Sequence, residues 1–134
     1  MTVLYRRLAC VAAGLLLASS AAFAERRIPD AVIVFAPDAD GILLADNSTL
    51  ERLSAKAKAG EDKWLSLEAY ADDQGSRELN LALAQRRIED VTHHLVALGF
   101  PANRIRGTSY GDEHMDESDL PMRRVEIRIR RLQR

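Results

Sequence analysis

The sequence predicts an α+β fold in which two helices cover one face of a small mixed sheet, in the order β-α-β-α-β-β. Three observations lead to this prediction. Four short segments are either β-branched and apolar or alternate between apolar and polar residues, as strands do. Two longer segments between the first three strands carry apolar residues at helical spacing. No internal repeat or linker-like stretch divides the chain, so we expect a single layered domain.

The first two dozen residues predict an export signal rather than part of the fold. Arg6 and Arg7 precede an apolar stretch, and Ala22-Phe23-Ala24 has the small-x-small form of a cleavage site. An uncleaved membrane anchor is the alternative, but the apolar stretch is shorter than the ~20 residues that cross a bilayer. We therefore expect residues 1–24 to be a cleaved signal peptide and residues 25–134 to form one domain.

Composition excludes several classes of function. Cys10 is the only cysteine and lies in the predicted signal, so the mature chain should contain neither a disulfide nor a cysteine-bound metal. The formal charge of the whole chain is −1, and it becomes more negative once Arg6 and Arg7 are removed. A mildly acidic chain with one Trp and three Phe has no electrostatic footprint for nucleic acid.

The first strand and first helix are predicted between Ala31 and Ala59. Ala31–Ala36 is a β-branched apolar run bounded by prolines, and turn residues follow it. Ser48-Thr49-Leu50-Glu51 has the form of a capping box, which predicts a helix from there to about Ala59. The expected apolar stripe of this helix is Leu50, Leu53 and Ala57.

The remaining elements follow the same logic. Lys63–Tyr70 alternates and has one wholly apolar face, which predicts a strand. The next helix should end at Leu98-Gly99, before Pro101, with an apolar stripe made of Ile88, Val91, Leu95 and Leu98. Third and fourth strands are predicted at Arg104–Tyr110 and Arg124–Arg130, on either side of an acidic loop.

The candidate binding residues lie where the strand Lys63–Tyr70 meets the following helix. Asp72-Asp73-Gln74-Gly75 is an acidic turn, and the helix carries Arg86-Arg87. A carboxylate and a guanidinium held close together suit a zwitterionic ligand. In one continuous helix from Ser76, however, Arg87 would lie ~15 Å from the turn, at 1.5 Å per residue. Local sequence does not decide whether the helix is continuous or restarts near Ala84.

Residues 31–130 resemble the OmpA-like peptidoglycan-binding domain family. Six elements stand in the family's order and spacing: Tyr70-Ala71-Asp72, then Gly75, Ser76 and Asn80, then Leu83-Ala84-Gln85-Arg86-Arg87, Gly99-Phe100 to Arg104-Ile105, Tyr110-Gly111, and Arg123-Arg124-Val125-Glu126-Ile127. The chain departs from the family at Ala71 and Ala84, where the family has Thr and a helix-capping Ser. It also has Ala69 for a Gly and Met122 for an Asn, and its acidic loop is shorter.

The resemblance implies a function and roles for residues. Asp72 would hold the ammonium and Arg87 the carboxylate of the diaminopimelate residue of a peptidoglycan stem peptide. Asn80, Ala71 and Arg124 would complete the ligand-binding set, and the main helix would start near Ala84. The resemblance also implies a periplasmic protein of a Gram-negative cell, with association to the outer membrane or cell wall as a further option.

The sequence also allows an alternative function, and it contains residues that must be tested as metal ligands or catalytic groups. The main alternative is an interaction module of the same fold that has lost peptidoglycan binding and docks to an envelope or secretion-system protein. His93 and His94 are adjacent on a helix and cannot both ligate one ion, and His114 lies in a loop better read as solvated. No catalytic triad or carboxylate pair has motif spacing. We therefore expect a binding protein without cofactor, metal or enzymatic activity.

Overall fold

A computed structural model describes residues 28–37, 39–42, 46–71, 75–111 and 121–133. The elements are β1 (Ala31–Val34), α1 (Asn47–Lys58), β2 (Lys63–Tyr70), α2 (Arg77–Ala97), a short 3-10 turn (Ala102–Arg104), β3 (Ile105–Gly111) and β4 (Arg124–Arg131). The predicted order β-α-β-α-β-β is confirmed. Among the described residues, no helix is both long and apolar enough to cross a membrane.

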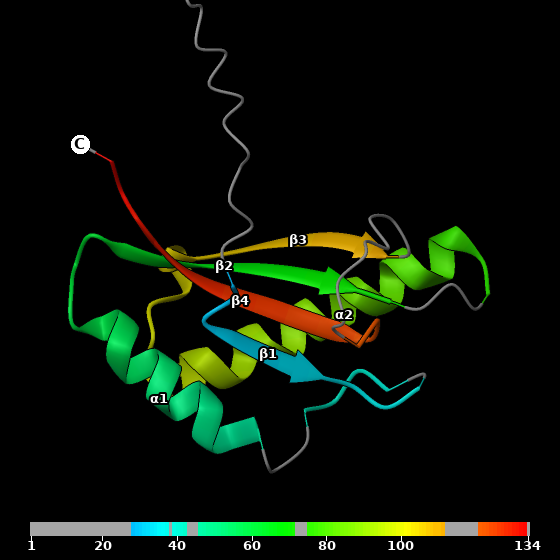
Figure 1. The fold of residues 1–134 in the computed structure, drawn as a ribbon, viewed down its shortest axis with the longest axis horizontal. Helices are drawn as coiled ribbons and strands as arrows, with labels where there is room; N and C mark the ends of the chain where they lie inside the picture. The colour runs from blue at the N-terminus through cyan, green and yellow to red at the C-terminus, as the bar shows by residue number, and fades with distance from the viewer. Residues whose placement is uncertain (1–27, 38, 43–45, 72–74, 112–120, 134) are drawn as a thin grey trace, which may run out of the picture.

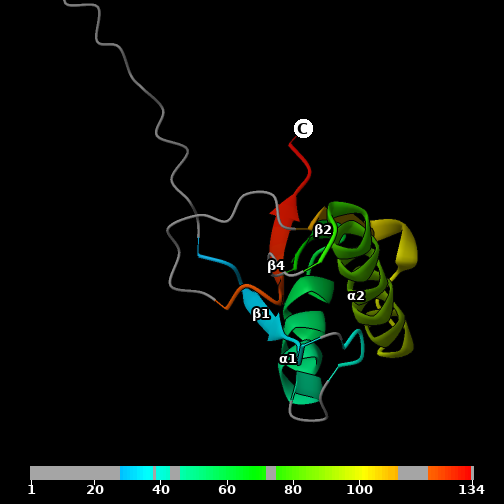
Figure 2. The same ribbon diagram turned by 90° about the vertical axis from the view of Figure 1, so that its right-hand side faces the viewer.

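The four strands form one mixed sheet in the order β1-β4-β2-β3. β4 runs antiparallel to both of its neighbours, whereas β2 and β3 are parallel. Both helices lie on the same side of this sheet (Figures 1 and 2). The predicted α+β class, with two helices covering one face of a small mixed sheet, is therefore confirmed.

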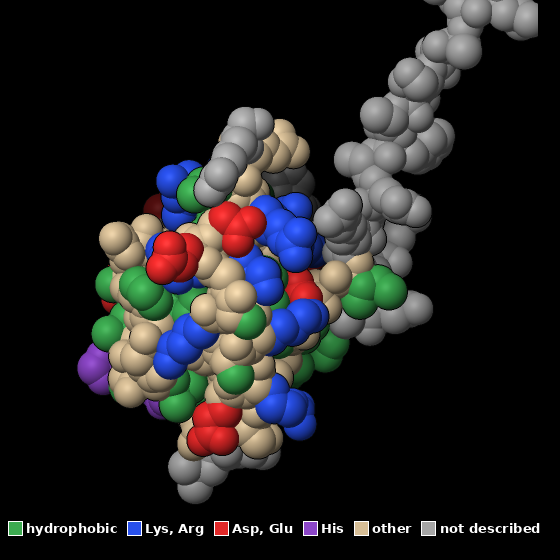
Figure 3. Space-filling view, turned by 90° about the vertical axis from the view of Figure 1, so that its left-hand side faces the viewer, with side chains coloured by type: hydrophobic (Ala, Val, Ile, Leu, Met, Phe, Trp, Pro, Cys, Tyr) green, Lys and Arg blue, Asp and Glu red, His purple; other side chains and the backbone are tan. Residues whose placement is uncertain are grey.

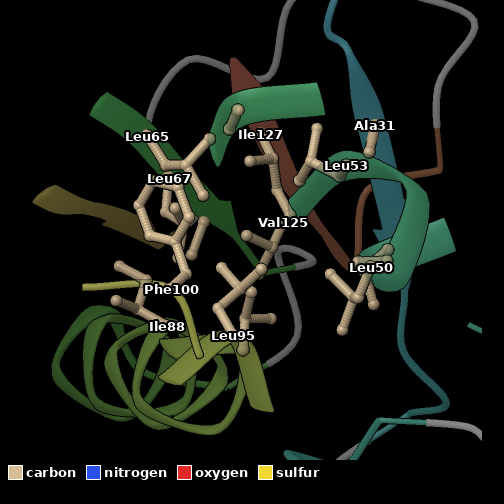
Figure 4. Packing of buried hydrophobic residues seen from close by; sticks show 14 of the residues in the cluster. Ala31, Leu50, Leu53, Leu65, Leu67, Ile88, Leu95, Phe100, Val125 and Ile127 are labelled. Carbon is tan, nitrogen blue, oxygen red and sulfur yellow. The ribbon is translucent and has the colours of Figure 1, made fainter. Parts of the chain in front are cut away.

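The core lies between the helices and the sheet. The predicted stripes of both helices face it: Leu50, Leu53 and Ala57 of α1 and Ile88, Val91 and Leu95 of α2 are all buried. From the sheet, Leu65, Leu67, Val125 and Ile127 meet them, and Phe100 fills the space beside Ile88 (Figure 4). Every residue of this core cluster lies between Ala31 and Ile127.

The helix ends differ from prediction in one case. α1 begins at Asn47, with Asp46 at its N-cap and no side-chain cap, so the predicted Ser48–Glu51 capping box is wrong. Because Asp46 already has helical dihedral angles, the helix starts early and Ser48 falls inside its first turn. α2 ends as predicted, since Leu98 is its C-cap and Gly99 follows with φ of 82°, a conformation that favours glycine.

Candidate functional site at the end of strand β2

The candidate site lies where β2 ends and α2 packs back against the sheet. One face of α2 turns toward the sheet, and its buried residues follow helical spacing: Asn80, Ala84, Arg87, Ile88, Val91 and Leu95. The apolar members sit over the middle of the sheet. Asn80, Ala84 and Arg87 precede them, so the polar part of this face lies at the sheet end where β2 stops.

Arg87 is the central residue of this region. Its side chain is fully buried, although it carries a charge. Nε donates to the carbonyl oxygen of Ala39 at 2.8 Å, and the other two nitrogens donate to the carbonyls of Tyr70 at 3.3 Å and Ala36 at 3.4 Å. The guanidinium also lies 5.0 Å from the centre of the Phe35 ring. Arg87 therefore ties the segment after β1 to the last residue of β2.

Three backbone carbonyls and one aromatic ring are among the groups that surround the Arg87 guanidinium. Carbonyl oxygens accept hydrogen bonds from a guanidinium, and the face of an aromatic ring attracts it. Neither the carbonyls nor the ring carries a formal charge. A guanidinium in surroundings of low dielectric constant attracts an anion at the adjoining surface more strongly than one in water does. The arrangement is therefore suited to holding a carboxylate near the end of β2.

The predicted restart of the helix near Ala84 is wrong. α2 is continuous from Arg77 to Ala97, with Ser76 at its N-cap, where the hydroxyl accepts the amide of Leu79 at 3.2 Å. Ala84 lies in mid-helix and is fully buried, so it takes no part in capping. The helix N-terminus also lies ~15 Å from Arg87, too far for its partial charge to act on a ligand held there.

Arg87 nevertheless reaches the end of β2. For a continuous helix, the sequence had predicted that Arg87 would lie too far from this point. The first turns of α2 extend past the end of the sheet before the helix runs back over it (Figure 1). To leave Arg87 beside the end of β2, the connection to Arg77 must be as long as the ~15 Å of helix between Arg77 and Arg87. Six residues, 71–76, can span up to ~20 Å, which is enough. The overhanging turns are braced by β3, because the Ser109 hydroxyl donates to the carbonyl of Leu81 at 2.9 Å.

Asn80 is the second polar residue on the buried face of α2. It is 4% exposed, and its side-chain nitrogen has no hydrogen-bond partner. A buried amide that donates no hydrogen bond costs about 1–3 kcal/mol, so such a group calls for an explanation. A ligand that supplies an acceptor would recover that cost.

Ala71 follows β2 directly and is also buried. Its amide donates to the carbonyl of Gly111 at 2.7 Å, which joins the ends of β2 and β3. The whole residue is 1% exposed, so neither its methyl group nor its backbone is open to solvent. Asp72 lies outside the described residues, as does His114.

Arg124 lies on the opposite side of Tyr70 from Arg87. Tyr70 and Arg124 pair across β2 and β4, and their side chains point away from the helices. The Arg124 guanidinium lies 4.2 Å from the centre of the Tyr70 ring, and Nε donates to Glu126 at 2.7 Å. Arg87 contacts the carbonyl of Tyr70, and Arg124 contacts its ring. The two arginines thus hold one residue from two sides.

Arg124 belongs to a buried charge network on the outer face of the sheet. Glu126 accepts from Arg124 through one oxygen and from Arg128 through the other, and Arg128 also pairs with Glu68 at 2.6 Å. Burial raises the pKa of Tyr70 to about 12, and the negative charges of Glu126 and Glu68 add to this effect. Tyr110 stacks on Tyr70 with ring centres 5.3 Å apart.

Sequence reasoning missed several parts of this region. Phe35 and the carbonyls of Ala36 and Ala39 come from the segment after β1, about fifty residues from Arg87. The only signal for Phe35 was its place at the end of an apolar run before Pro37. Among the described residues, no group of three or more His, Cys, Asp or Glu could hold a metal ion.

Comparison with known proteins identifies the family. The model of the OmpA family matches residues 34–127, which include the end of β1, both helices and the first half of β4. The chain belongs to the OmpA family. The match includes Arg87, Asn80 and Arg124, and it also includes Asp72.

Several relatives carry names that refer to peptidoglycan. The peptidoglycan-associated lipoprotein of Rhizobium meliloti is 37% identical over 81 residues, which are 60% of this chain and 46% of the relative. The peptidoglycan-binding protein ArfA of Mycobacterium tuberculosis is 31% identical over 101 residues, 71% of this chain and 31% of the relative. The chain thus spans about half or less of the length of these OmpA family relatives.

Solved structures show the same OmpA-like fold. The peptidoglycan-associated lipoprotein of Burkholderia pseudomallei superposes with a TM-score of 0.67 at 22% identity, covering 74% of this chain and 89% of that one. The C-terminal domain of Helicobacter pylori MotB superposes with a TM-score of 0.64 at 20% identity, covering 75% and 84%. At these identities the likeness establishes the fold and not the ligand.

Proposed function

We propose that this OmpA family protein binds peptidoglycan non-covalently, through the diaminopimelate residue of the stem peptide. The observation that carries the proposal is the buried guanidinium of Arg87, which donates to the carbonyl of Tyr70 at the end of β2. Asp72 follows Tyr70 by two residues in the sequence. The family's pattern assigns the ligand carboxylate to Arg87 and the ligand ammonium to Asp72. The peptidoglycan-related names of its relatives support the same ligand class.

The described residues give each partner a physical role. Arg87 is held in one orientation by three carbonyls, so little side-chain entropy remains to be lost on binding. Asn80 contributes an unpaired donor from the same helix face. Arg124 acts indirectly, because it fixes the ring of Tyr70. Ala71 also acts indirectly, through the amide that joins the ends of β2 and β3. Nothing in this mechanism requires a bond to be broken.

The chain is proposed to act in the periplasm after removal of residues 1–24. The basic, apolar and small-x-small segments in that order support export and cleavage before Glu25. Amino-terminal sequencing of the protein recovered from a periplasmic extract tests this, with Glu25 as the expected first residue. An intact Met1 terminus in that fraction would contradict cleavage.

A pull-down with purified peptidoglycan sacculi tests the function. Wild-type protein should sediment with sacculi that contain diaminopimelate and much less with sacculi that contain lysine at that position. Asp72→Asn should abolish retention, and Arg87→Lys should weaken it, because lysine keeps the charge but loses the planar fork. Arg86→Ala is the matched control, since Arg86 is adjacent and exposed.

Each outcome of this experiment separates the candidate functions. Wild-type protein that stays in the supernatant would contradict peptidoglycan binding and favour the interaction module without it. Retention that Asp72→Asn leaves unchanged would contradict the assigned site. Release of soluble fragments from the sacculi would indicate an enzyme.

A further inference from the structure

A second charged region lies at the other end of the sheet from Arg87. A pocket of about 600 Å³ is lined by Lys56, Lys63, Ile129, Arg130, Arg131 and Gln133. It is formed where the C-terminal turn of α1, the start of β2 and the end of β4 meet. Lys63 and Tyr70 are the two ends of β2, so this pocket and the Arg87 region are separated by ~23 Å, at 3.3 Å per residue.

The pocket carries a surplus of positive charge. Lys56 pairs with Asp30 at 3.0 Å, and the other oxygen of Asp30 accepts the amide of Ile129 at 2.8 Å. Lys63 donates to the carbonyl of Lys56, which leaves its charge uncompensated. The side chains of Arg130 and Arg131 make no hydrogen bond or ion pair with any other described residue, although their backbones pair with Trp64 and Lys63 in the sheet. Of four cations, one is therefore paired with a carboxylate.

Exposed apolar side chains flank these cations. Leu132 follows Arg131, is 58% exposed, and is fixed by a hydrogen bond from its amide to the carbonyl of Asp62 at 2.9 Å. Ile28 is 90% exposed and lies two residues before Asp30, the partner of Lys56. Two apolar side chains next to unpaired cations are the combination that lets a surface rest on a membrane, with the apolar groups at the headgroup boundary.

We propose that this basic pocket, defined by Lys56, Lys63, Arg130 and Arg131, docks to the phosphate headgroups of an anionic lipid membrane. The occupant is assigned from charge complementarity and from Ile28 and Leu132, which a soluble phosphate compound would leave exposed. Figure 3 faces this end of the molecule and shows Lys and Arg side chains spread over it, with some Asp and Glu among them. The exposed acids Glu61 and Asp62, in the turn before β2, limit the attraction.

The proposal goes beyond peptidoglycan binding and does not depend on it. If both hold, the domain would contact a membrane at one end of its sheet and a wall polymer ~23 Å away at the other. The attraction acts over a Debye length of about 8 Å at physiological ionic strength, so docking should be strongly weakened by salt.

Vesicle sedimentation tests the proposal. The protein is used from Glu25 onward, because an apolar leader would bind lipid by itself and the core cluster of the described residues lies after that point. Wild type should sediment with phosphatidylglycerol vesicles in low salt and not with phosphatidylcholine vesicles. Arg130→Gln/Arg131→Gln should reduce the partition coefficient on the order of 25-fold, since each basic residue near an anionic surface contributes about fivefold.

The control is Arg77→Gln/Arg86→Gln, which removes the same charge from exposed positions at the other end of the molecule. It should bind vesicles as the wild type does. Equal binding by wild type and Arg130→Gln/Arg131→Gln would overturn the proposal, and so would failure of wild type to bind anionic vesicles. Saturable binding to soluble polyglutamate without vesicle binding would assign the pocket to an acidic protein segment instead.

Discussion

The arginines at the two ends of the sheet differ in what holds them. Arg87, at the end of β2, is fully buried and donates to three backbone carbonyls. At the end of β4, Arg130 is partly buried and Arg131 is exposed, and neither side chain has an ion pair among the described residues. Because it is buried and hydrogen-bonded to the backbone, Arg87 should stabilise the fold as well as contribute to the candidate site. The other two contribute to the surface potential alone, so the two ends should respond very differently to substitution.

The largest expected effect is on Arg87. Arg87→Ala removes the hydrogen bonds to the carbonyls of Ala36, Ala39 and Tyr70 and opens a cavity beside Phe35, although the Ala36 carbonyl keeps the amide of Ala39 as a donor. Each unsatisfied buried group costs about 1–3 kcal/mol, so the free energy of unfolding should fall by about 4 kcal/mol or more. Urea unfolding measures this. Arg86→Ala, one residue away and exposed, should cost less than about 0.5 kcal/mol, and equal costs would contradict the assigned role.

The charge network on the outer face should show the next largest effect. Glu126→Gln keeps the side chain's size but removes the negative charge between Arg124 and Arg128. Breaking a buried ion pair on one side costs about 3–5 kcal/mol, and Glu68 still pairs with Arg128, so we expect about 2–3 kcal/mol. The control Glu89→Gln lies on the exposed face of α2. A Glu126→Gln protein as stable as that control would show that the network is not coupled to folding.

A smaller effect should appear at high pH. The pKa of Tyr70 is about 12 in the folded protein against 10.0 for an ordinary tyrosine, because burial and two nearby carboxylates disfavour the phenolate. The unfolded chain therefore loses this proton first. Stability that is present below pH 10 should be lost as the pH rises toward 12. Urea midpoints should fall over this range in the wild type and less steeply in Tyr70→Phe.

The smallest effect on stability is expected at the basic pocket. Arg130→Gln/Arg131→Gln should change the free energy of unfolding by less than about 0.5 kcal/mol, because surface charges without an ion pair contribute little to folding and glutamine keeps much of the aliphatic stem. Relief of repulsion could even raise stability slightly at low salt. Thermal unfolding in low and high salt measures this, and a large loss would show that these arginines hold the fold together.

The sequence predicted those features that depend on local pattern. Helical spacing of Leu50, Leu53 and Ala57 and the alternation of Lys63–Tyr70 report directly on which side chains face the core. Gly99 and Pro101 determine where α2 stops. These signals lie within a few residues of the structure that they specify, so the element order and the core followed from them.

The geometry of the site depended on contacts that are distant in the sequence. Whether α2 could bring Arg87 to β2 was decided by how far the helix overhangs the sheet, which Ser109 and Leu81 help to fix. The burial of Arg87 depends on Ala36 and Ala39, which no local pattern connects to it. The family resemblance correctly indicated the fold but wrongly indicated a helix start near Ala84, since Ser76 provides the cap here.

The central claim is that the Arg87 guanidinium holds the carboxylate of a diaminopimelate stem peptide. Its Nε–H, buried and bonded to the carbonyl of Ala39, should exchange slowly enough to give a resolved nitrogen–proton NMR signal. Adding a soluble diaminopimelate muropeptide should shift this signal and the side-chain amide signals of Asn80, with saturation, in wild type and not in Asp72→Asn. Saturable shifts that spare Arg87 and Asn80, or no shifts at all, would contradict the account.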